Sequence, residues 1–500
     1  MANGSMGRVS TVGDHVALRT KLSFAIGGAA EGAMTWAFTG FNFIIYTIGF
    51  GLPGTLAGLA VFLSIILDAV SDPLIGYVSD RWRSKLGRRH PFIYISALPL
   101  GACIVAIYMP PDLLLTNSNE LWSLFGVAAT PEQWGLAFWL FLFASVFKFF
   151  HTCYTLPHLS LGSELTNDYL ERTRIFRYNM LFSFGGGASL SWTFYNVFFP
   201  EGPTLGMDLS WFAGAVALFG ALLIFLTAHW TRDQIPKLAQ PRDDLPRFTI
   251  KAFLAETVIV FKNRNYLMLF FGLLCLSIMV GVRETLNANM GLYYWELPPA
   301  LMGYMPLFSM TSYFVAVVIV AKANQVLEKG GTARIAVFLC VSAAAIPVLL
   351  RSFELIPANG HPAIFWIVGI SVFCYYGSLA VLTTTVYSAI GDVVDEHELA
   401  TGERQEGIFY AVRTFFGKMS NGIGHLVAGI AIDVIGFPPG AVVGEVPPQV
   451  IFELGLFDGV IAGIPTLFAI YFYGRYKINK ARHKEILSEL SARRAAALAS

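Results

Sequence analysis

The sequence predicts an all-α membrane protein with about twelve transmembrane helices arranged as two halves of about six. Composition is the first reason, because hydrophobic residues fill 55% and charged residues only 13% of the 500 positions. A soluble domain has about 25% charged residues. The mean hydropathy of +0.60 agrees with this. So few charges cannot cover the surface of a soluble protein of this size, and lipid must replace water around much of the chain.

The second reason is that the apolar residues come in long blocks separated by short polar joints. A bilayer core of about 30 Å needs about 20 apolar residues of helix. We predict spans at 22–50, 54–79, 91–110, 134–158, 178–199 and 209–230, and then at 266–295, 302–323, 335–351, 362–390, 408–435 and 456–474. Glycine-rich spans could also be broken helices, which membrane proteins tolerate where a cavity is lined.

The third reason is that Lys and Arg gather in alternate joints. They are dense at 80–90, in the central joint and in the tail, whereas the joints 111–133, 200–208 and 436–455 contain none. Positive charge marks the cytoplasmic side, so both termini and the central joint are predicted to be cytoplasmic. We expect an N-terminal half (1–230), a central joint (231–265), a C-terminal half (266–474) and a basic tail (475–500).

The two halves resemble each other at one place. An acidic turn between spans four and five, 162–174, matches an acidic turn between spans ten and eleven, 391–407, and each contains Glu–Arg before a new helix. This match suggests an internal repeat.

Four ionisable residues lie deep in the predicted spans: Glu31, Asp68, Lys148 and Lys418. At 1.5 Å of rise per residue, all four fall roughly 14–16 Å from the cytoplasmic ends of their spans. A charge at this depth costs several kcal/mol unless it faces a cavity or a partner. We therefore expect a polar cavity near the middle of the membrane, formed by at least four spans.

Asp68 and Asp72 are four residues apart, so they share one helix face. Two carboxylates this close repel each other, and a bound cation or a retained proton relieves the repulsion. Carboxylate oxygens suit a hard cation, to which a neighbouring hydroxyl can add a ligand. The alternative is that Asp72 ends a helix, because Pro73 disrupts the hydrogen-bond ladder.

The remaining deep polar groups allow two interpretations each. Lys148 and Lys418 either face the cavity or form structural ion pairs with the acidic residues. The adjacent Arg283 and Glu284, with Asn287, either contact a substrate or clamp two helices together. His151, three residues after Lys148, is either a proton relay or a satisfied hydrogen-bonding group.

Several motifs resemble one family, the glycoside–pentoside–hexuronide:cation symporters of the major facilitator superfamily (the melibiose permease-like family). The specific element is Asp-x-x-x-Asp-Pro at 68–73 with the basic loop at 83–88. Further matches lie at 20–23, 152–157, 391–395 and 405–418, so the resemblance covers nearly the whole chain. Parts of the sequence are also similar to plant sucrose carriers and to animal sodium-dependent lysolipid carriers. The resemblance implies the major facilitator fold.

The resemblance also implies roles for single residues. Asp68 and Asp72 would bind the cation, with the hydroxyl of Thr152 as a further ligand, and Lys418 would couple the cation site to the substrate site. The loop residues Asp80, Arg81, Gly87 and Arg88 would latch the two halves and control closure on the cytoplasmic side.

Two departures from the family pattern bear on the cargo and the ion. Thr155 stands where galactoside-carrying members have an aspartate, so the galactoside-gripping set is absent. Lys148 is an additional positive charge beside the expected sodium site, which leaves Na⁺ or H⁺ open as the coupling ion.

The expected function is cation-coupled symport of a sugar or glycoside-like solute by alternating access, with the substrate near Glu31, Lys148, Arg283 and Lys418. A carrier of lysolipids or other amphiphiles, or a passive or exchange transporter, is the alternative. An enzyme is not expected, because the sequence lacks HExxH, GxSxG and a phosphate-binding Gly-rich loop. We expect a monomer in a bacterial inner membrane, with a small-molecule substrate, no nucleic-acid partner, no metal site and no cofactor beyond the coupling ion.

Overall fold

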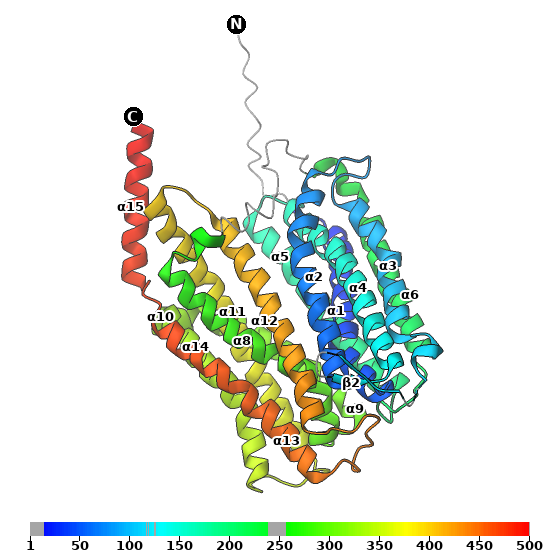
Figure 1. Cartoon of the computed structure of the whole chain (residues 1–500). Helices are drawn as coiled ribbons and strands as arrows, with labels where there is room; N and C mark the ends of the chain where they lie inside the picture. The colour runs from blue at the N-terminus through cyan, green and yellow to red at the C-terminus, as the bar shows by residue number, and fades with distance from the viewer. Residues whose placement is uncertain (1–14, 117, 119, 125–126, 239–256, 500) are drawn as a thin grey trace.

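The computed structural model describes residues 15–499 apart from 117, 119, 125–126 and 239–256 (Figure 1). Its helices form two groups that lie side by side. The N-terminal half contains α1 (Leu18–Ile44), α2 (Gly54–Arg81), α3 (His90–Tyr108), α4 (Pro131–Glu164), α5 (Tyr169–Thr193) and α6 (Ser210–Thr231). The C-terminal half contains α8 (Arg264–Asn289), α9 (Pro299–Met302), α10 (Met305–Ser352), α11 (Ala363–Thr401), α12 (Glu406–Val434), α13 (Pro448–Gly459) and α14 (Ile464–Gly474).

Shorter elements extend or join these helices. The 3-10 and π turns are η1 (Ile45–Gly49), η2 (Asp112–Leu114), η3 (Phe194–Phe198), η4 (Arg232–Lys237), η5 (Met290–Tyr294) and η6 (Ile461–Gly463). The strands β1 (Trp122–Leu124) and β2 (Val127–Ala129) form an antiparallel hairpin between α3 and α4, which the sequence analysis did not anticipate. The tail forms helix α15 (Lys480–Ala499), which projects from the same face as the start of α1. We call this the terminal face.

The all-α fold is confirmed, and the predicted spans coincide with helices. Eight helical stretches in the described part of the chain are long and apolar enough to cross a membrane, and one of them, Pro299–Ser352, contains two predicted spans. These two passes meet at Glu328, where the backbone has the non-helical φ of 57°. The last span is a broken helix, α13 and α14, interrupted at η6.

Two details of the sequence interpretation were wrong. The segment 391–396 is not a turn, because α11 continues through it to Thr401 and ends at Gly402 with a left-handed φ of 83°. The alternative that Asp72 ends a helix also fails, since α2 runs through Pro73 to Arg81. Of the predicted central joint, residues 239–256 lie outside the described part, so the division at 231–265 stays a prediction.

Local capping explains where several helices begin. The hydroxyl of Thr130 accepts from the backbone N–H of Gln133, and the Gln133 side chain accepts from the Thr130 N–H, a capping box that starts α4. Asp168 caps α5 and Asn263 caps α8 more simply, since each side chain accepts one hydrogen bond from a backbone N–H of the first turn. These caps fix the register of α4 and α8, two helices that carry site residues.

The two halves meet most closely between α2 and α12, at the face opposite the termini. Gly54 and Gly58 of α2 pack directly on His425 and Gly429 of α12, so the backbones are in contact. In Figure 1 the lower ends of α2 and α12 converge, whereas their upper ends stand apart. The molecule is therefore closed at the face opposite the termini.

Gly429→Ala is expected to shift the protein towards a state that is open at this opposite face. A Cβ at Gly429 would lie 2.1 Å from the carbonyl oxygen of Gly54, so α2 and α12 must separate. Distances between spin labels at Thr55 and Val434 would lengthen relative to the parent. Gly76→Ala is the matched control, because a Cβ there meets nothing within 4 Å. An unchanged distance in Gly429→Ala would contradict this account of the contact.

Candidate functional site

Four side chains from both halves meet at the centre of the interface. Lys418 of α12 donates to Asp68 Oδ2 at 2.8 Å and to Asp72 Oδ2 at 2.5 Å. The hydroxyl of Thr152 on α4 lies 3.1 Å from Asp68 Oδ1 and 2.8 Å from Asp72 Oδ1, so its one proton can be donated to either carboxylate. We call these four residues the central cluster. The two carboxylates therefore share one face of α2, as their spacing predicted, and the ammonium of the other half lies between them.

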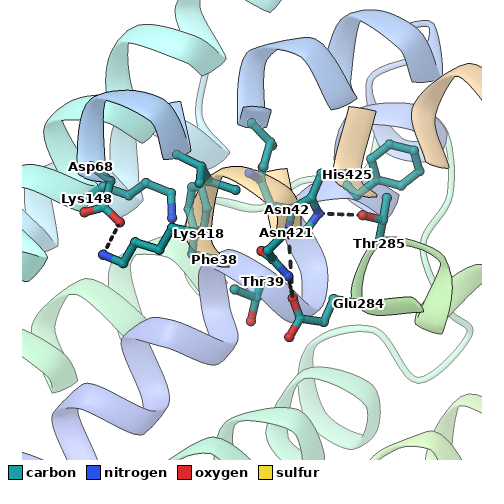
Figure 2. A pocket seen from close by; sticks show the side chains of 13 residues that line it. Phe38, Thr39, Asn42, Asp68, Lys148, Glu284, Thr285, Lys418, Asn421 and His425 are labelled. Atoms are coloured by element: carbon teal, nitrogen blue, oxygen red, sulfur yellow. Dashed lines mark hydrogen bonds and ion pairs between the residues drawn. The ribbon is translucent and has the colours of Figure 1, made fainter. Parts of the chain in front are cut away.

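A cavity of about 180 Å³ adjoins the central cluster (Figure 2). Its walls come from α1, α2, α4, α8 and α12, so both halves contribute. Phe38, Phe43, Val61 and Ile65 form its apolar part. The polar and charged lining consists of Thr39, Asn42, Asp68, Lys148, Glu284, Thr285, Lys418, Asn421 and His425.

Lys148 lies at the cluster end of the cavity, where its ammonium is 4.9 Å from the centroid of the Phe38 ring. Within the described residues no carboxylate oxygen lies within 4.0 Å of this ammonium, although Asp68 is near enough to attract it electrostatically, so the predicted structural pair is not a direct contact in this state. His151, one turn further along α4, shares a hydrogen bond of 3.2 Å with the Thr35 hydroxyl. His151 thus has a neutral partner on α1.

The adjacent Arg283 and Glu284 go to different places. Glu284 faces the central cavity and accepts from the Asn421 amide at 3.1 Å, with His425 at 3.8 Å. Arg283 points into the C-terminal half, where it pairs with Asp458 at 2.9 Å. Of the two interpretations of this pair, Arg283 fits the helix clamp and Glu284 fits the cavity.

Three further predicted residues lie away from the central cavity. Asn287 lines two smaller cavities, one beside the Arg283–Asp458 pair and one that reaches Trp36 of α1. Glu31 and Thr155 are partly buried on α1 and α4 and are not among the residues that line the central cavity. The expectation that Glu31 and Arg283 lie at one site with Lys148 and Lys418 is therefore not met in this state.

The loop between α2 and α3 forms a charged network on the terminal face. Asp80 pairs with Arg89 at 2.6 Å, and Arg88 and Arg89 pair with Glu164 of α4 at 2.9 and 3.0 Å. Gly87 has a φ of 72°, which the tight turn before these arginines requires. Arg81 stacks on the Tyr77 ring at 3.9 Å. These contacts join α2, α3 and α4 within the N-terminal half, so the loop does not bridge the halves through them.

In the C-terminal half, the loop between α11 and α12, which matches the turn between α4 and α5, is organised by Arg404. This side chain donates to Glu398 and Asp395 at 3.0 Å each and to Glu406 at 3.2 Å. These hydrogen bonds raise the pKa of Arg404 above its already high ordinary value. The Glu–Arg element of the C-terminal half is thus part of a charged network on the terminal face.

Sequence reasoning missed Asp433, which joins the halves at the opposite face. Its two carboxylate oxygens accept from the backbone N–H groups of Gly54 and Thr55, each at 2.7 Å. A residue of α12 therefore caps the first turn of α2, where the helix dipole also favours a negative charge. The only signal in the sequence was the position of Asp433 near the end of a span, because backbone N–H groups leave no side-chain pattern that would reveal the partner.

Asp433→Ala is expected to speed hydrogen exchange of the amides of Gly54 and Thr55 by about 2- to 30-fold, since losing a helix cap costs about 0.5–2 kcal/mol. Exchange measured by mass spectrometry on the peptide around these residues tests this. Glu445→Ala, at an exposed position between α12 and α13, is the control. Unchanged protection in Asp433→Ala would show that this cap does not hold the halves together.

Comparisons with known proteins agree with this geometry. The family model described as MFS/sugar transport protein matches residues 23–480. An uncharacterised symporter of Synechocystis is 25% identical, over 95% of this chain and 96% of its own. An inner membrane symporter of Escherichia coli is 22% identical, over 95% of each chain. The inward-open xylose transporter of Escherichia coli superposes with a TM-score of 0.57 over 94% of this chain and 98% of its own, at 13% identity.

The xylose transporter confirms the fold alone, at this level of identity. The matches to the family model and to the two symporters cover nearly the whole chain, and they rule out an enzyme. The chain belongs to the MFS/sugar transport family, so it is a multi-pass membrane transporter with the major facilitator fold.

Proposed function

We propose that this transporter is a secondary active symporter that couples Na⁺ or H⁺ to the movement of a sugar or glycoside-like solute. The observation that carries the proposal is the position of Lys418, which lies between Asp68 and Asp72 and comes from the opposite half. A cation that binds the carboxylates competes with this lysine. Ion binding is thereby linked to the contact between the halves.

The cycle follows from this competition. Without the ion, Lys418 neutralises the two carboxylates and ties α12 to α2. Na⁺ or H⁺ arriving at Asp68, Asp72 and Thr152 takes over the neutralisation and releases the ammonium towards the cavity. Solute bound there then contacts both halves, and the loaded protein closes and reopens at the other face. Each ligand favours closure only when the other is present, which is symport.

The size and lining of the cavity favour a polar solute over the alternative lysolipid. Pockets for drug-sized ligands have roughly 300–1,000 Å³, whereas this cavity has about 180 Å³ and charged groups at both ends. An acyl chain would need a longer and more apolar space. The family description, which names sugar transport, supports the same choice.

Uptake into proteoliposomes tests the proposal. Purified protein is reconstituted, and labelled monosaccharides and glycosides are added under an inward Na⁺ gradient, an inward H⁺ gradient or no gradient. Accumulation above the external concentration with one gradient supports symport and identifies the ion. Equilibration that is indifferent to both gradients would favour a passive carrier, and uptake only against internal solute would favour an exchanger.

We also propose that the protein is a monomer of a bacterial inner membrane with both termini in the cytoplasm. The basic joint at 80–90 and the basic tail lie on the terminal face, which supports this orientation. One relative is named as an inner membrane protein. The orientation can be checked with the substitution Lys477→Cys, labelled in intact cells and in inverted vesicles. A membrane-impermeant thiol reagent should reach position 477 only in the inverted vesicles.

A further inference from the structure

A second large cavity lies on the outer surface of the C-terminal half, apart from the central cavity. It has a volume of about 430 Å³ and lies between the two passes of α10 and the middle of α11. Among the described residues, none lines both this cavity and the central one. We call it the α10–α11 groove, and its walls include Val315, Ile319, Leu327, Ile335, Leu339 and Ile346.

The α10–α11 groove is apolar and open to the bilayer. Ile335 and Leu339 are 44% and 49% exposed, although they lie in a membrane-spanning stretch, and exposed Phe338 continues the same surface beside them. Ala336 and Gly377 are part of the lining, and their small size leaves space between the larger side chains. Water enters a cavity only where polar groups bind it, whereas a hydrocarbon chain in the groove gains contacts on three sides. The groove therefore suits the hydrocarbon that already surrounds the protein.

One polar group of the groove has no hydrogen-bond partner in the described part of the chain. Thr332 lines the groove and is 2% exposed, and its hydroxyl is buried without a partner there. A threonine inside a helix often donates to the carbonyl one turn earlier. That residue is Glu328, where the two passes of α10 meet and the backbone is not helical. The Thr332 hydroxyl is thus available to an acceptor that the protein does not supply.

Thr332 stands at the terminal-face end of the groove. Lys329, three residues earlier, pairs with Asp392, which also lies 3.5 Å from His483 of α15. From Thr332 to Ile346 the second pass of α10 rises about 21 Å. Half of a bilayer core is roughly 15 Å, so the groove is long enough for one acyl chain of the terminal-face leaflet. Thr332 then lies near the polar end of that chain.

We propose that the α10–α11 groove binds one acyl chain of a phospholipid from the terminal-face leaflet, and that the Thr332 hydroxyl donates to an ester carbonyl of this lipid. The protein holds this lipid more tightly than the lipids around its convex surfaces, because the groove contacts the chain on three sides and supplies a hydrogen bond. The lipid packs the two passes of α10 against α11 inside one half. The site is therefore independent of the proposed symport.

A phospholipid with a photoactivatable diazirine in one acyl chain tests the site. The full-length protein is reconstituted in vesicles that contain this probe, illuminated and digested, and the labelled peptides are identified by mass spectrometry. Labelling should be several-fold stronger on α10 and α11 than on α3 and α6, which also expose large apolar residues. Ala343→Phe, which places a ring in the groove, should remove this excess. Ala321→Phe is the matched control, because Ala321 is exposed on the same helix and does not line the groove.

The hydrogen bond has its own test, in which defined phosphatidylethanolamine is titrated into the detergent-purified protein and bound lipids are counted by native mass spectrometry. Thr332→Val keeps the shape of the side chain and removes its donor, so the tightest lipid should bind about 2- to 10-fold more weakly. Thr311→Val is the control, because the Thr311 hydroxyl already donates to the Leu307 carbonyl. Elution of each variant as a single peak separates loss of the site from loss of the fold.

Several results would overturn the assignment. Even labelling of all lipid-facing helices would show that the groove holds no lipid of its own, and so would excess labelling that survives in Ala343→Phe. Displacement of the probe by oleic acid but not by unlabelled phospholipid would assign the groove to a free fatty acid. Cross-links between two copies of the chain through α10 would assign it to a second copy. Equal lipid affinity in Thr332→Val and the parent would remove the hydroxyl from the site.

Discussion

Asp68→Asn is expected to abolish ion-driven accumulation of solute, with a loss of at least about a hundredfold, because breaking a buried ion pair costs about 3–5 kcal/mol. Asp68 is 8% exposed and accepts hydrogen bonds from Thr152 and Lys418. The amide keeps the shape of the carboxyl but carries no charge, so it neither attracts a cation nor balances Lys418. Proteoliposome uptake with and without the coupling-ion gradient measures the effect.

The matched control is Asp112→Asn, which removes a carboxylate from an exposed position in η2. It should transport at the parental rate. Exchange of labelled solute across the membrane at equal ion concentrations distinguishes two ways in which Asp68→Asn could lose accumulation. We expect exchange to survive at a reduced rate, because Asp68 binds the ion and not the solute. Full accumulation in Asp68→Asn would remove the central cluster from the coupling mechanism.

The charged part of the site could be anticipated because deep charges break the strongest rule of the sequence. In spans that are otherwise apolar, Glu31, Asp68, Lys148 and Lys418 carry a large energetic penalty, and equal depth in different helices leaves a shared cavity as the simplest explanation. The helix period then places Asp68 and Asp72 on one face. The structure brings Asp68, Lys148 and Lys418 to one cavity and leaves Glu31 outside its lining, and the roles of these residues stay predictions.

Other features depend on contacts that no sequence pattern encodes. Arg283 was expected near the substrate together with Glu284. Neighbours on a helix point about 100° apart, however, and the Arg283 guanidinium forms an ion pair with Asp458 of the broken last span. Asn42 lines the cavity but was not predicted as a site residue, because an uncharged amide is less costly in a membrane span than a charge. The end of α11 was predicted too early, because the acidic residues at 391–396 are typical of a turn. In the structure they stay helical, and Asp392 and Asp395 form ion pairs with Lys329, His483 and Arg404.

Whether two paired charges belong to the same half or to different halves decides whether their contact holds the fold or changes during transport. Arg283 and Asp458 both belong to the C-terminal half, so their ion pair can persist while the halves rock. Lys418 and the carboxylates of α2 belong to different halves, so their contact must change whenever the halves separate there. An ion that replaces Lys418 therefore acts at a contact where charge and rigid-body motion are linked.

Lys418→Met is expected to make the stability of the protein depend on the coupling ion. Without the Lys418 ammonium, Asp68 and Asp72 lose their direct ion-pair partner at the α2–α12 interface and keep the hydrogen bonds of the Thr152 hydroxyl. Their repulsion should lower the thermal midpoint in ion-free buffer, and the coupling ion should restore it, because a ligand that binds only the folded state stabilises it in proportion to its saturation. The ion should also bind at least about tenfold more tightly, since its intramolecular competitor is gone.

Thermal unfolding of Lys418→Met in Na⁺ and in choline, each at two pH values, reads out both effects and separates Na⁺ from H⁺. Lys322→Met is the control and should unfold like the parent under all four conditions. In uptake assays, Lys418→Met should bind the ion but fail to accumulate solute. The reason is that occupation of the carboxylates no longer changes the contact between the halves. A Lys418→Met protein that is as stable as the parent without ions, and that still accumulates solute, would mean that the ion pair at the centre is structural and that coupling arises elsewhere.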